Sequence, residues 1–253
     1  MNRKIRITLS FVILLLLWQG LSVSLANDVL LPSPMAVGSK MLHQLQNELF
    51  YTAVFSTFLR VLSGFVIALL TALITALLTY LYPVIADYLY PLLLLTRSVP
   101  NISYILIVLF WCSPKTSVIV ISFLILFPTV YTNLYQGLCA CPKEYSDVMK
   151  LYPGSRLFDV RHVYLPYLRG YLYTSASIGI SLALKVGIMA EILGQANDGI
   201  GRQLNLCRLD LDTSGIFAWT IWIIVLLFTA DRLLAEMKRL FEKMNHKNSI
   251  RQY

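Results

Sequence analysis

The stretch CPKEYSDVMKLYPGSRLFDVRHVYLP, residues 141–166, is a polar segment set between two long apolar ones. Its basic side chains outnumber its acidic ones: Lys143, Lys150, Arg156, Arg161 and the nearby Arg169 against Glu144, Asp147 and Asp159. Loops of membrane proteins that are rich in Lys and Arg stay in the cytoplasm. The stretch is therefore predicted to be a cytoplasmic loop, facing the compartment that holds ATP.

The first half of this loop has the pattern of a short amphipathic helix. Apolar residues recur at steps of three and four and share one helix face: Tyr145, Val148, Leu151 and Tyr152. Pro142 suits the first turn of a helix, and Pro153 followed by Gly154 ends one. A short amphipathic helix outside the bilayer, followed by a turn, is typical of a docking element.

The composition places the chain among integral membrane proteins. Of its 253 residues, 57% are hydrophobic and only 13% are charged, against roughly 25% charged in soluble domains. The net charge of +8 comes from basic residues in the termini and loops that flank apolar runs, where membrane orientation accounts for them. We therefore expect membrane lipid, and no nucleic acid, among the partners.

The cysteines and histidines form no metal-binding pattern. No CxxC pair occurs among the four cysteines, and the three histidines are isolated. Free thiols are expected, and a bridge between Cys112 and Cys207 on the outer side stays an alternative. We expect no metal, no cofactor and no catalytic residue in this chain.

Six apolar segments are each long enough to cross a bilayer core of about 30 Å. They are residues 7–25, 53–81, 87–111, 117–138, 167–190 and 213–230, with the loop 139–166 between the fourth and fifth. Six spans give an all-α membrane fold in one domain, residues 1–253, with both termini cytoplasmic. A cleaved signal peptide is the alternative to a retained first helix.

Small residues form a stripe along the second predicted span. Gly64, Ala68, Ala72 and Ala76 repeat every four residues, which favours close packing against another helix. Arg60 lies toward the outer end of the same span and is expensive in lipid, so it should extend to the interface or face a polar interior.

Two other spans contain features that suggest a polar path. The third is interrupted by Arg97-Ser-Val-Pro100, and a proline break is tolerated in a membrane only where protein or water satisfies the freed carbonyls. The alternative is a plain kink. Lys185 in the fifth span either extends toward the surface or contributes to the same path. After it, residues 191–212 are predicted to form an outer loop, with its glycine-rich part, 194–201, as a turn.

The cytoplasmic loop resembles the EAA loop of ABC importer permeases. The resemblance rests on Asp147-Val-Met, Gly154 and Val163-Tyr-Leu-Pro166. Further short matches follow the order seen in the nitrate, sulfonate and taurine branch of these importers: Leu31-Pro-Ser-Pro34, Phe58-Leu-Arg60-Val-Leu-Ser-Gly64-Phe65, Pro91, Arg97-Ser-Val-Pro100, Phe127-Pro128, Ala190-Glu191-Ile-Leu-Gly194, Gly199-Ile-Gly201, Phe217-Ala218-Trp219 and Asp231-Arg232.

This resemblance implies a permease of the type I ABC importer kind in a bacterial inner membrane. It would form a dimer, expected to be a homodimer, receive its solute from an extracytoplasmic binding protein and be driven by a pair of cytoplasmic ATPase subunits. The expected contacts with the ATPase are Glu144, Tyr145, Asp147, Val148, Leu151 and Gly154, and the candidates for the path are Arg97, Pro100 and Lys185.

The lack of a nucleotide-binding motif in the sequence agrees with this resemblance. The sequence has no G-x-x-x-x-G-K-[ST] motif, so ATP must be hydrolysed by a partner. A channel that needs no ATPase, or a polytopic membrane enzyme, is the alternative. An enzyme would need converging acids, bases or nucleophiles within the spans, and the pattern shows only scattered Arg60, Arg97 and Lys185. The solute, whether oxyanion, sulfonate or pyrimidine-like vitamin precursor, stays open.

Overall fold

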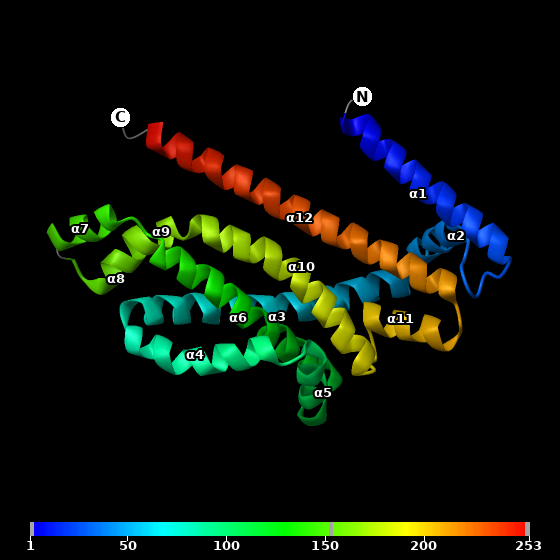
Figure 1. The fold of residues 1–253 in the computed structure, drawn as a ribbon, viewed down its shortest axis with the longest axis horizontal. Helices are drawn as coiled ribbons and strands as arrows, with labels where there is room; N and C mark the ends of the chain where they lie inside the picture. The colour runs from blue at the N-terminus through cyan, green and yellow to red at the C-terminus, as the bar shows by residue number, and fades with distance from the viewer. Residues whose placement is uncertain (1–2, 152–153, 251–253) are drawn as a thin grey trace.

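The computed structural model describes residues 3–151 and 154–250, and side chains throughout these ranges except at 3–4, 97, 146 and 240–250. The described residues form helices joined by short connections (Figure 1) and contain no strand. The elements are α1 (Arg3–Leu25), α2 (Pro34–Leu45), α3 (Glu48–Leu81), α4 (Pro83–Ser98), α5 (Asn101–Trp111), α6 (Pro114–Cys139), α7 (Lys143–Leu151), α8 (Arg156–Asp159), a π-helical turn (Val160–Tyr164), α9 (Leu165–Tyr167), α10 (Arg169–Leu193), α11 (Ile200–Leu209) and α12 (Thr213–Ile250).

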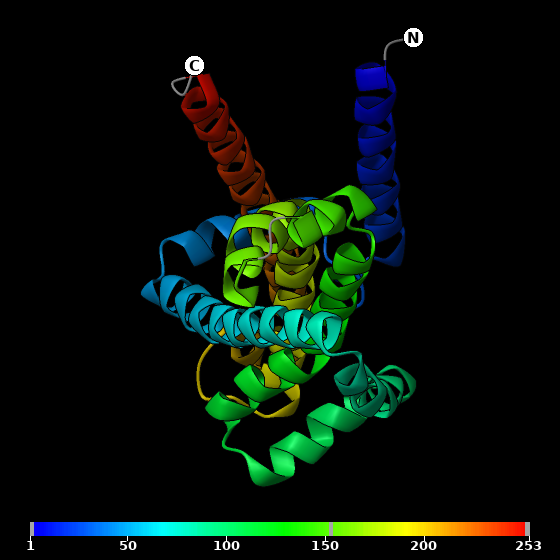
Figure 2. The ribbon, with the colours of Figure 1, turned by 90° about the vertical axis from the view of Figure 1, so that its left-hand side faces the viewer.

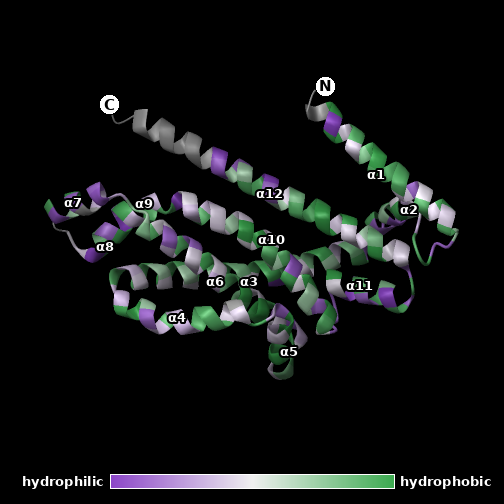
Figure 3. Ribbon diagram, in the orientation of Figure 1, coloured by the Kyte–Doolittle hydropathy of each residue, from purple (hydrophilic) through white to green (hydrophobic). Residues whose placement is uncertain are grey.

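Five of these helices are long and apolar enough to cross a membrane, namely α1, α3, α6, α10 and α12. The pair α4 and α5 makes a sixth candidate if it is counted as one broken span. Colouring by hydropathy shows the apolar residues concentrated in these helices, whereas α7 and α8 are largely polar (Figure 3). The expectation of an all-α membrane fold is confirmed.

The third predicted span, 87–111, is two helices rather than one. α4 and α5 meet at an angle of 98°. Val99 is extended, with φ −84° and ψ 129°, and Pro100 caps α5. The cause is local, because proline disfavours the α conformation in the residue before it and lacks the N–H that would continue the helix. The break was predicted at this position, but its sharpness was not.

The core lies where α3 crosses α6 and α10. The small residues predicted to pack, Gly64, Ala68, Ala72 and Ala76, are all buried. A Cβ atom added at Gly64 would lie 2.7 Å from the Cβ of Ser122 and 2.8 Å from the carbonyl oxygen of Ile119. Only glycine therefore allows α3 and α6 to approach this closely.

The segment after α10, predicted to be an outer loop, is more ordered than predicted. Residues 191–212 were expected to form a loop, but α10 continues to Leu193 and α11 occupies Ile200–Leu209. Lys40 of α2 pairs with Asp212 just after α11, at 2.6 Å. Partial burial disfavours the charged form of this carboxyl, yet hydrogen bonds from Lys40 and from the N–H of Gly215, with the charge of Lys40, outweigh it and lower the pKa of Asp212. The pair ties α2 to the start of α12.

The helix α1 stands apart from the bundle, as the views in Figures 1 and 2 both show. The indole N–H of Trp18 in α1 donates a hydrogen bond to the carbonyl oxygen of Pro32 at 3.0 Å, and the indole ring stacks on Phe217 of α12. Only 6% of the residues in the most apolar part of α1 are buried against the rest of the described chain. Such a surface is suited to hydrocarbon and not to water.

The cysteines are free, as expected, and no disulfide joins Cys112 to Cys207.

Candidate functional site

A pocket of about 470 Å³ lies beside the break between α4 and α5. One part of its wall is apolar, with Leu124, Ile125, Pro128 and Leu182. The other part is polar and is formed by Thr96, Asn101, Tyr104, Thr129, Thr132, Asn133 and Gln136. The wall therefore combines residues of α4, α5, α6 and α10, and its described lining residues carry no charge.

The three residues proposed for a polar path have different relations to this pocket. Pro100 stands between two lining residues, Val99 and Asn101. Arg97 follows Thr96, another lining residue, but its side chain is outside the described part of the chain. Lys185 is exposed and lies three residues beyond Leu182 on α10. It is not among the described lining residues of the pocket.

The loop at residues 139–166 contains the predicted amphipathic helix as α7. Tyr145, Val148 and Leu151, three apolar residues of the predicted face, are 47%, 56% and 75% exposed. Met149 of the same helix is partly buried against the bundle, and Tyr152 lies outside the described residues. Asp147 pairs with Lys150 at 3.0 Å and both are exposed, as is Glu144. The helix therefore presents a mostly exposed apolar face with a polar border; the ring of Tyr145 packs against that of Tyr167, whereas Val148 and Leu151 are exposed.

The second half of the 139–166 loop is attached to the bundle at several points. Gly154 is exposed and precedes Ser155, whose hydroxyl caps α8. Arg156 donates a hydrogen bond to the hydroxyl of Tyr82 at 2.6 Å, in the turn between α3 and α4. Tyr164 packs edge-on against Tyr80, and its burial, with smaller effects from Tyr80, raises the pKa of Tyr164 to about 12. A displacement of this loop would therefore reach α3 and α4 directly.

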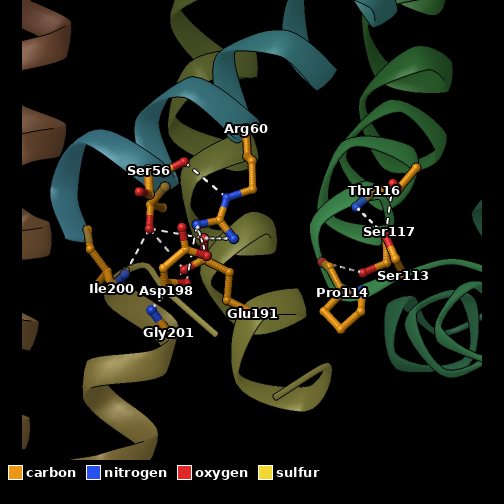
Figure 4. A network of polar contacts seen from close by, with 11 residues as sticks. Ser56, Arg60, Ser113, Pro114, Thr116, Ser117, Glu191, Asp198, Ile200 and Gly201 are labelled. Carbon is orange, nitrogen blue, oxygen red and sulfur yellow. Dashed lines mark hydrogen bonds and ion pairs between the residues drawn. The ribbon is translucent and has the colours of Figure 1, made fainter. Parts of the chain in front are cut away.

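A buried ionic network lies at the other end of the bundle, beside α11 (Figure 4). Glu191 of α10 is completely buried. Arg60 of α3 approaches it at 3.3 Å, approaches the carboxylate of Asp198 at 3.2 Å, and donates to the carbonyl oxygens of Ser56 and Asp198. The charge of Glu191 thus has a cation beside it, as a buried carboxylate requires.

The remaining partners of Glu191 come from hydroxyl and backbone donors. Thr57 lies 2.9 and 3.0 Å from its two carboxylate oxygens and accepts a hydrogen bond from the N–H of Ile200 at 2.8 Å. The N–H of Gly201 donates to the carboxylate at 2.9 Å. Gly199 has φ 108°, and a Cβ there would lie 2.6 Å from both carboxylate oxygens. The network therefore fixes α3, α10 and the start of α11 relative to one another.

The sequence analysis found half of this network. Arg60 was expected to extend to the interface or face a polar interior, and it faces the interior. Glu191 was assigned to the outer loop, and its burial was missed. The available signal was a basic residue, Arg60, and an acidic residue, Glu191, near the predicted outer ends of two spans, followed by the closely spaced Gly199 and Gly201.

The network shows no sign of a metal centre. Within the described ranges, no group of three or more His, Cys, Asp or Glu side chains is arranged to hold a metal ion. The Glu191 carboxylate is instead hydrogen-bonded by protein donors, which is typical of a structural tie.

Comparison with known proteins agrees with this architecture. Residues 64–239 match the family described as binding-protein-dependent transport system inner membrane component. The chain is similar to the formylaminopyrimidine transport permease protein ThiX of Halalkalibacterium halodurans, with 24% identity covering 87% of each chain. It is also similar to the riboflavin transport system permease protein RibX of Chloroflexus aurantiacus, with 26% identity covering 91% of this chain and 87% of that one. The chain therefore belongs to the family of binding-protein-dependent transport system inner membrane components, and it is a permease subunit of an ATP-driven importer, not an enzyme.

Proposed function

We propose that two copies of this chain form the translocation unit of an importer in a bacterial inner membrane. A binding protein outside the membrane delivers a small solute to it, and a pair of cytoplasmic ATPase subunits drives it through α7. The observation that supports this most directly is the exposed apolar face of α7, at Tyr145, Val148 and Leu151. Exposed apolar residues on a polar, membrane-external helix mark a site for a protein partner.

The contacts of α7 define its proposed role. Tyr145, Val148 and Leu151 insert into a groove of the ATPase, while Glu144 and Asp147 contact its polar edge. Gly154 allows the turn that follows. When the ATPases close on ATP, the loop moves, and the contact between Arg156 and Tyr82 at 2.6 Å passes the movement to the α3–α4 turn. Such a rigid-body shift changes which face of the bundle is open.

The proposed path follows the α4–α5 break. Arg97 and Pro100 border the pocket there, and the exposed Lys185 of α10 faces the second copy of the chain. The order of short motifs along the chain supports membership of the nitrate, sulfonate and taurine branch. The printed names of the two relatives, which concern formylaminopyrimidine and riboflavin, favour a heterocyclic solute within that branch.

The proposed orientation places both termini and α7 in the cytoplasm and α11 outside. A cysteine at Lys150, in a chain whose native cysteines are serine, should react with an impermeant thiol reagent only after the membrane is opened. A cysteine at Leu209, which is 64% exposed, should react in intact cells. Asn205 is unsuitable because it is buried. The opposite pattern of labelling would invert the topology.

The function itself is tested by transport in proteoliposomes that contain the permease, its ATPase and the binding protein. Uptake should require ATP and stop when the Lys of the ATPase phosphate-binding loop is replaced by Ala, because this chain has no nucleotide site of its own. The control contains the permease alone. Uptake at the same rate in that control would identify a channel.

A further inference from the structure

We infer that Lys185 of one copy of the chain forms an ion pair with Asp231 of the other copy, and that this pair occurs twice in the dimer. The inference rests on the proposed function, which supplies the second copy. It follows from two side chains of opposite charge that lie on one surface of α10 and α12, near the middle of both helices' apolar part, and that no described residue neutralises.

The depth of Asp231 follows from its contact with α10. The hydroxyl of Ser181 lies 3.5 Å from the Asp231 carboxylate. Farther along the same two helices, the ammonium of Lys238 lies 4.7 Å from the centre of the Tyr173 ring, so α10 and α12 run side by side here. Ser181 is the central residue of the 25-residue α10, with about 18 Å of helix on either side. Both helices are long and apolar enough to cross a membrane, so this contact places Asp231 close to the middle of the bilayer.

Lys185 lies on the same surface of the molecule. It follows Ser181 by four residues on α10, and residues four apart share one face of a helix. The level of Lys185 therefore differs from that of Asp231 by about 6 Å, close to one helical turn. Both side chains are exposed, and neither forms an ion pair with another described side chain. One surface thus carries a cation and an anion without a described ionic partner.

The surroundings of these two charges indicate a protein partner. A charged side chain near the bilayer centre is expensive in lipid, so such residues face protein or water and pair with one another. The neighbouring side chains on the two helices, Ile178, Ile224 and Phe228, are apolar and more than half exposed. Lipid would fit these apolar groups but not the charges, and water would fit the charges but not the apolar groups. A second protein surface with complementary charges fits both.

A second copy of the chain has those complementary charges. Two copies inserted in the same direction are related by a two-fold axis along the membrane normal, so each residue keeps its depth in both copies. The same surface then meets itself, and Lys185 of each copy lies opposite the Asp231 of the other. The flexible four-carbon stem of a lysine is long enough to cover the difference in depth of about 6 Å between the two residues.

Two other pairings of Asp231 compete with this one. The first is an ion pair with Lys185 of the same copy, which a rotation of the lysine side chain would allow. The second is a pair with Arg232 of the other copy. Arg232 follows Asp231 directly, and consecutive residues of a helix do not face each other. Both alternatives give different results in the following experiments.

Co-expression of two charge variants with different affinity tags tests the pairing in the assembled permease–ATPase complex. One copy carries Lys185→Asp and the other carries Asp231→Lys. In a dimer of identical copies, like charges meet at both contacts, whereas a mixed dimer has one restored pair and one original pair. We expect purification on both tags to recover mixed dimers in about tenfold or greater excess over dimers of either variant alone, because like charges across an interface are strongly disfavoured. A pair within one copy predicts no such excess, because mixing leaves each copy's own charges unchanged.

The matched control uses an ion pair that lies within one copy. Arg239 and Glu236 of α12 pair at 3.0 Å, and both are exposed. Arg239→Glu in one copy and Glu236→Arg in the other should give equal amounts of mixed and identical dimers. Lys185→Arg keeps the cation and should assemble as the unaltered chain does. Arg232→Gln should also leave assembly unchanged.

Cross-linking measures the same contact without adding a charge. In chains whose native cysteines are serine, one copy carries Lys185→Cys and the other, with a different tag, carries Asp231→Cys. A short bifunctional thiol reagent should join them into a band that carries both tags on a denaturing gel. A copy with Lys185→Cys and a second copy without cysteine should give no such band.

Three results would overturn the inference: mixed dimers no more abundant than identical ones, no cross-linked band that carries both tags, or a loss of assembly in Arg232→Gln as large as in Lys185→Asp. None of them bears on the proposed function, which stands or falls with the requirement for ATP and the ATPase during uptake by the unaltered chain.

Discussion

Replacing Arg60 with Met is expected to leave very little correctly assembled protein in the membrane. Glu191 is completely buried, and Arg60 lies beside both Glu191 and Asp198. Removing one partner of a buried ion pair leaves an uncompensated charge, at a cost of about 3–5 kcal/mol. Since domains are stable by only about 5–15 kcal/mol, the loss is a large part of the total. Size-exclusion chromatography and thermal unfolding of the detergent-solubilised protein measure it.

Three further variants separate the buried charge from other effects. Arg60→Lys keeps a cation but cannot reach Ser56, Glu191 and Asp198 at once, so an intermediate loss is expected. Adding Glu191→Gln to Arg60→Met removes the unpaired charge and should recover part of the stability. Arg239→Met breaks an exposed pair with Glu236 and should change stability by less than about 1 kcal/mol. Equal losses in Arg60→Met and Arg239→Met would mean that the buried network is not a structural tie.

Prediction from the sequence was most successful in the 139–166 loop. The helix predicted between Pro142 and Pro153 is α7, Lys143–Leu151. Its limits are set by residues next to it in the chain, since proline starts one end and a proline-glycine pair follows the other. Its apolar face also follows from spacing along a single helix. Local rules were sufficient because every determinant lies within a dozen residues.

The buried network shows why other features escaped prediction. Thr57 and Glu191 are 134 residues apart in the chain. Glu191 becomes buried only because residues 194–199 turn back and bring the N–H groups of Ile200 and Gly201 to meet it. A carboxylate at the end of an apolar segment is normally solvated, and spacing does not reveal that a later segment will cover it. The helix α11 was missed in the same region, as glycines and polar residues hide its pattern.

The pocket beside the α4–α5 break was also only partly predictable from the sequence. Pro100 predicts that a helix ends there, because the local sterics of proline are decisive. The 98° angle between α4 and α5 depends on packing against α6, and so does the meeting of residues from α4, α5, α6 and α10 in one pocket wall. Lys185 was proposed as a path residue because it is a cation within an apolar segment. The described pocket wall does not include it.

Replacing Val148 and Leu151 together with Asp is expected to abolish association with the ATPase while leaving the permease folded. The two side chains are 56% and 75% exposed, so the isolated chain loses little by the change. In the complex each would bring a charge into an apolar groove, and central contacts of this kind contribute about 2 kcal/mol or more each. Together they should weaken binding by about three orders of magnitude. Co-purification of the tagged permease with the ATPase, and the transport rate of the reconstituted complex, are the measurements.

The control is Leu211→Asp, which puts one such charge at a residue that is 68% exposed and follows α11, the helix at the end of the bundle away from α7 (Figure 1). It should bind the ATPase as the unaltered chain does. Because both variants add negative charge at exposed apolar positions, a general effect on insertion or solubility would appear in both, whereas loss of docking appears only in the α7 variant. If the α7 variant co-purified with a full complement of ATPase and transported at the normal rate, the force would have to enter the bundle elsewhere, and the attachment of Arg156 to Tyr82 would be the next contact to break.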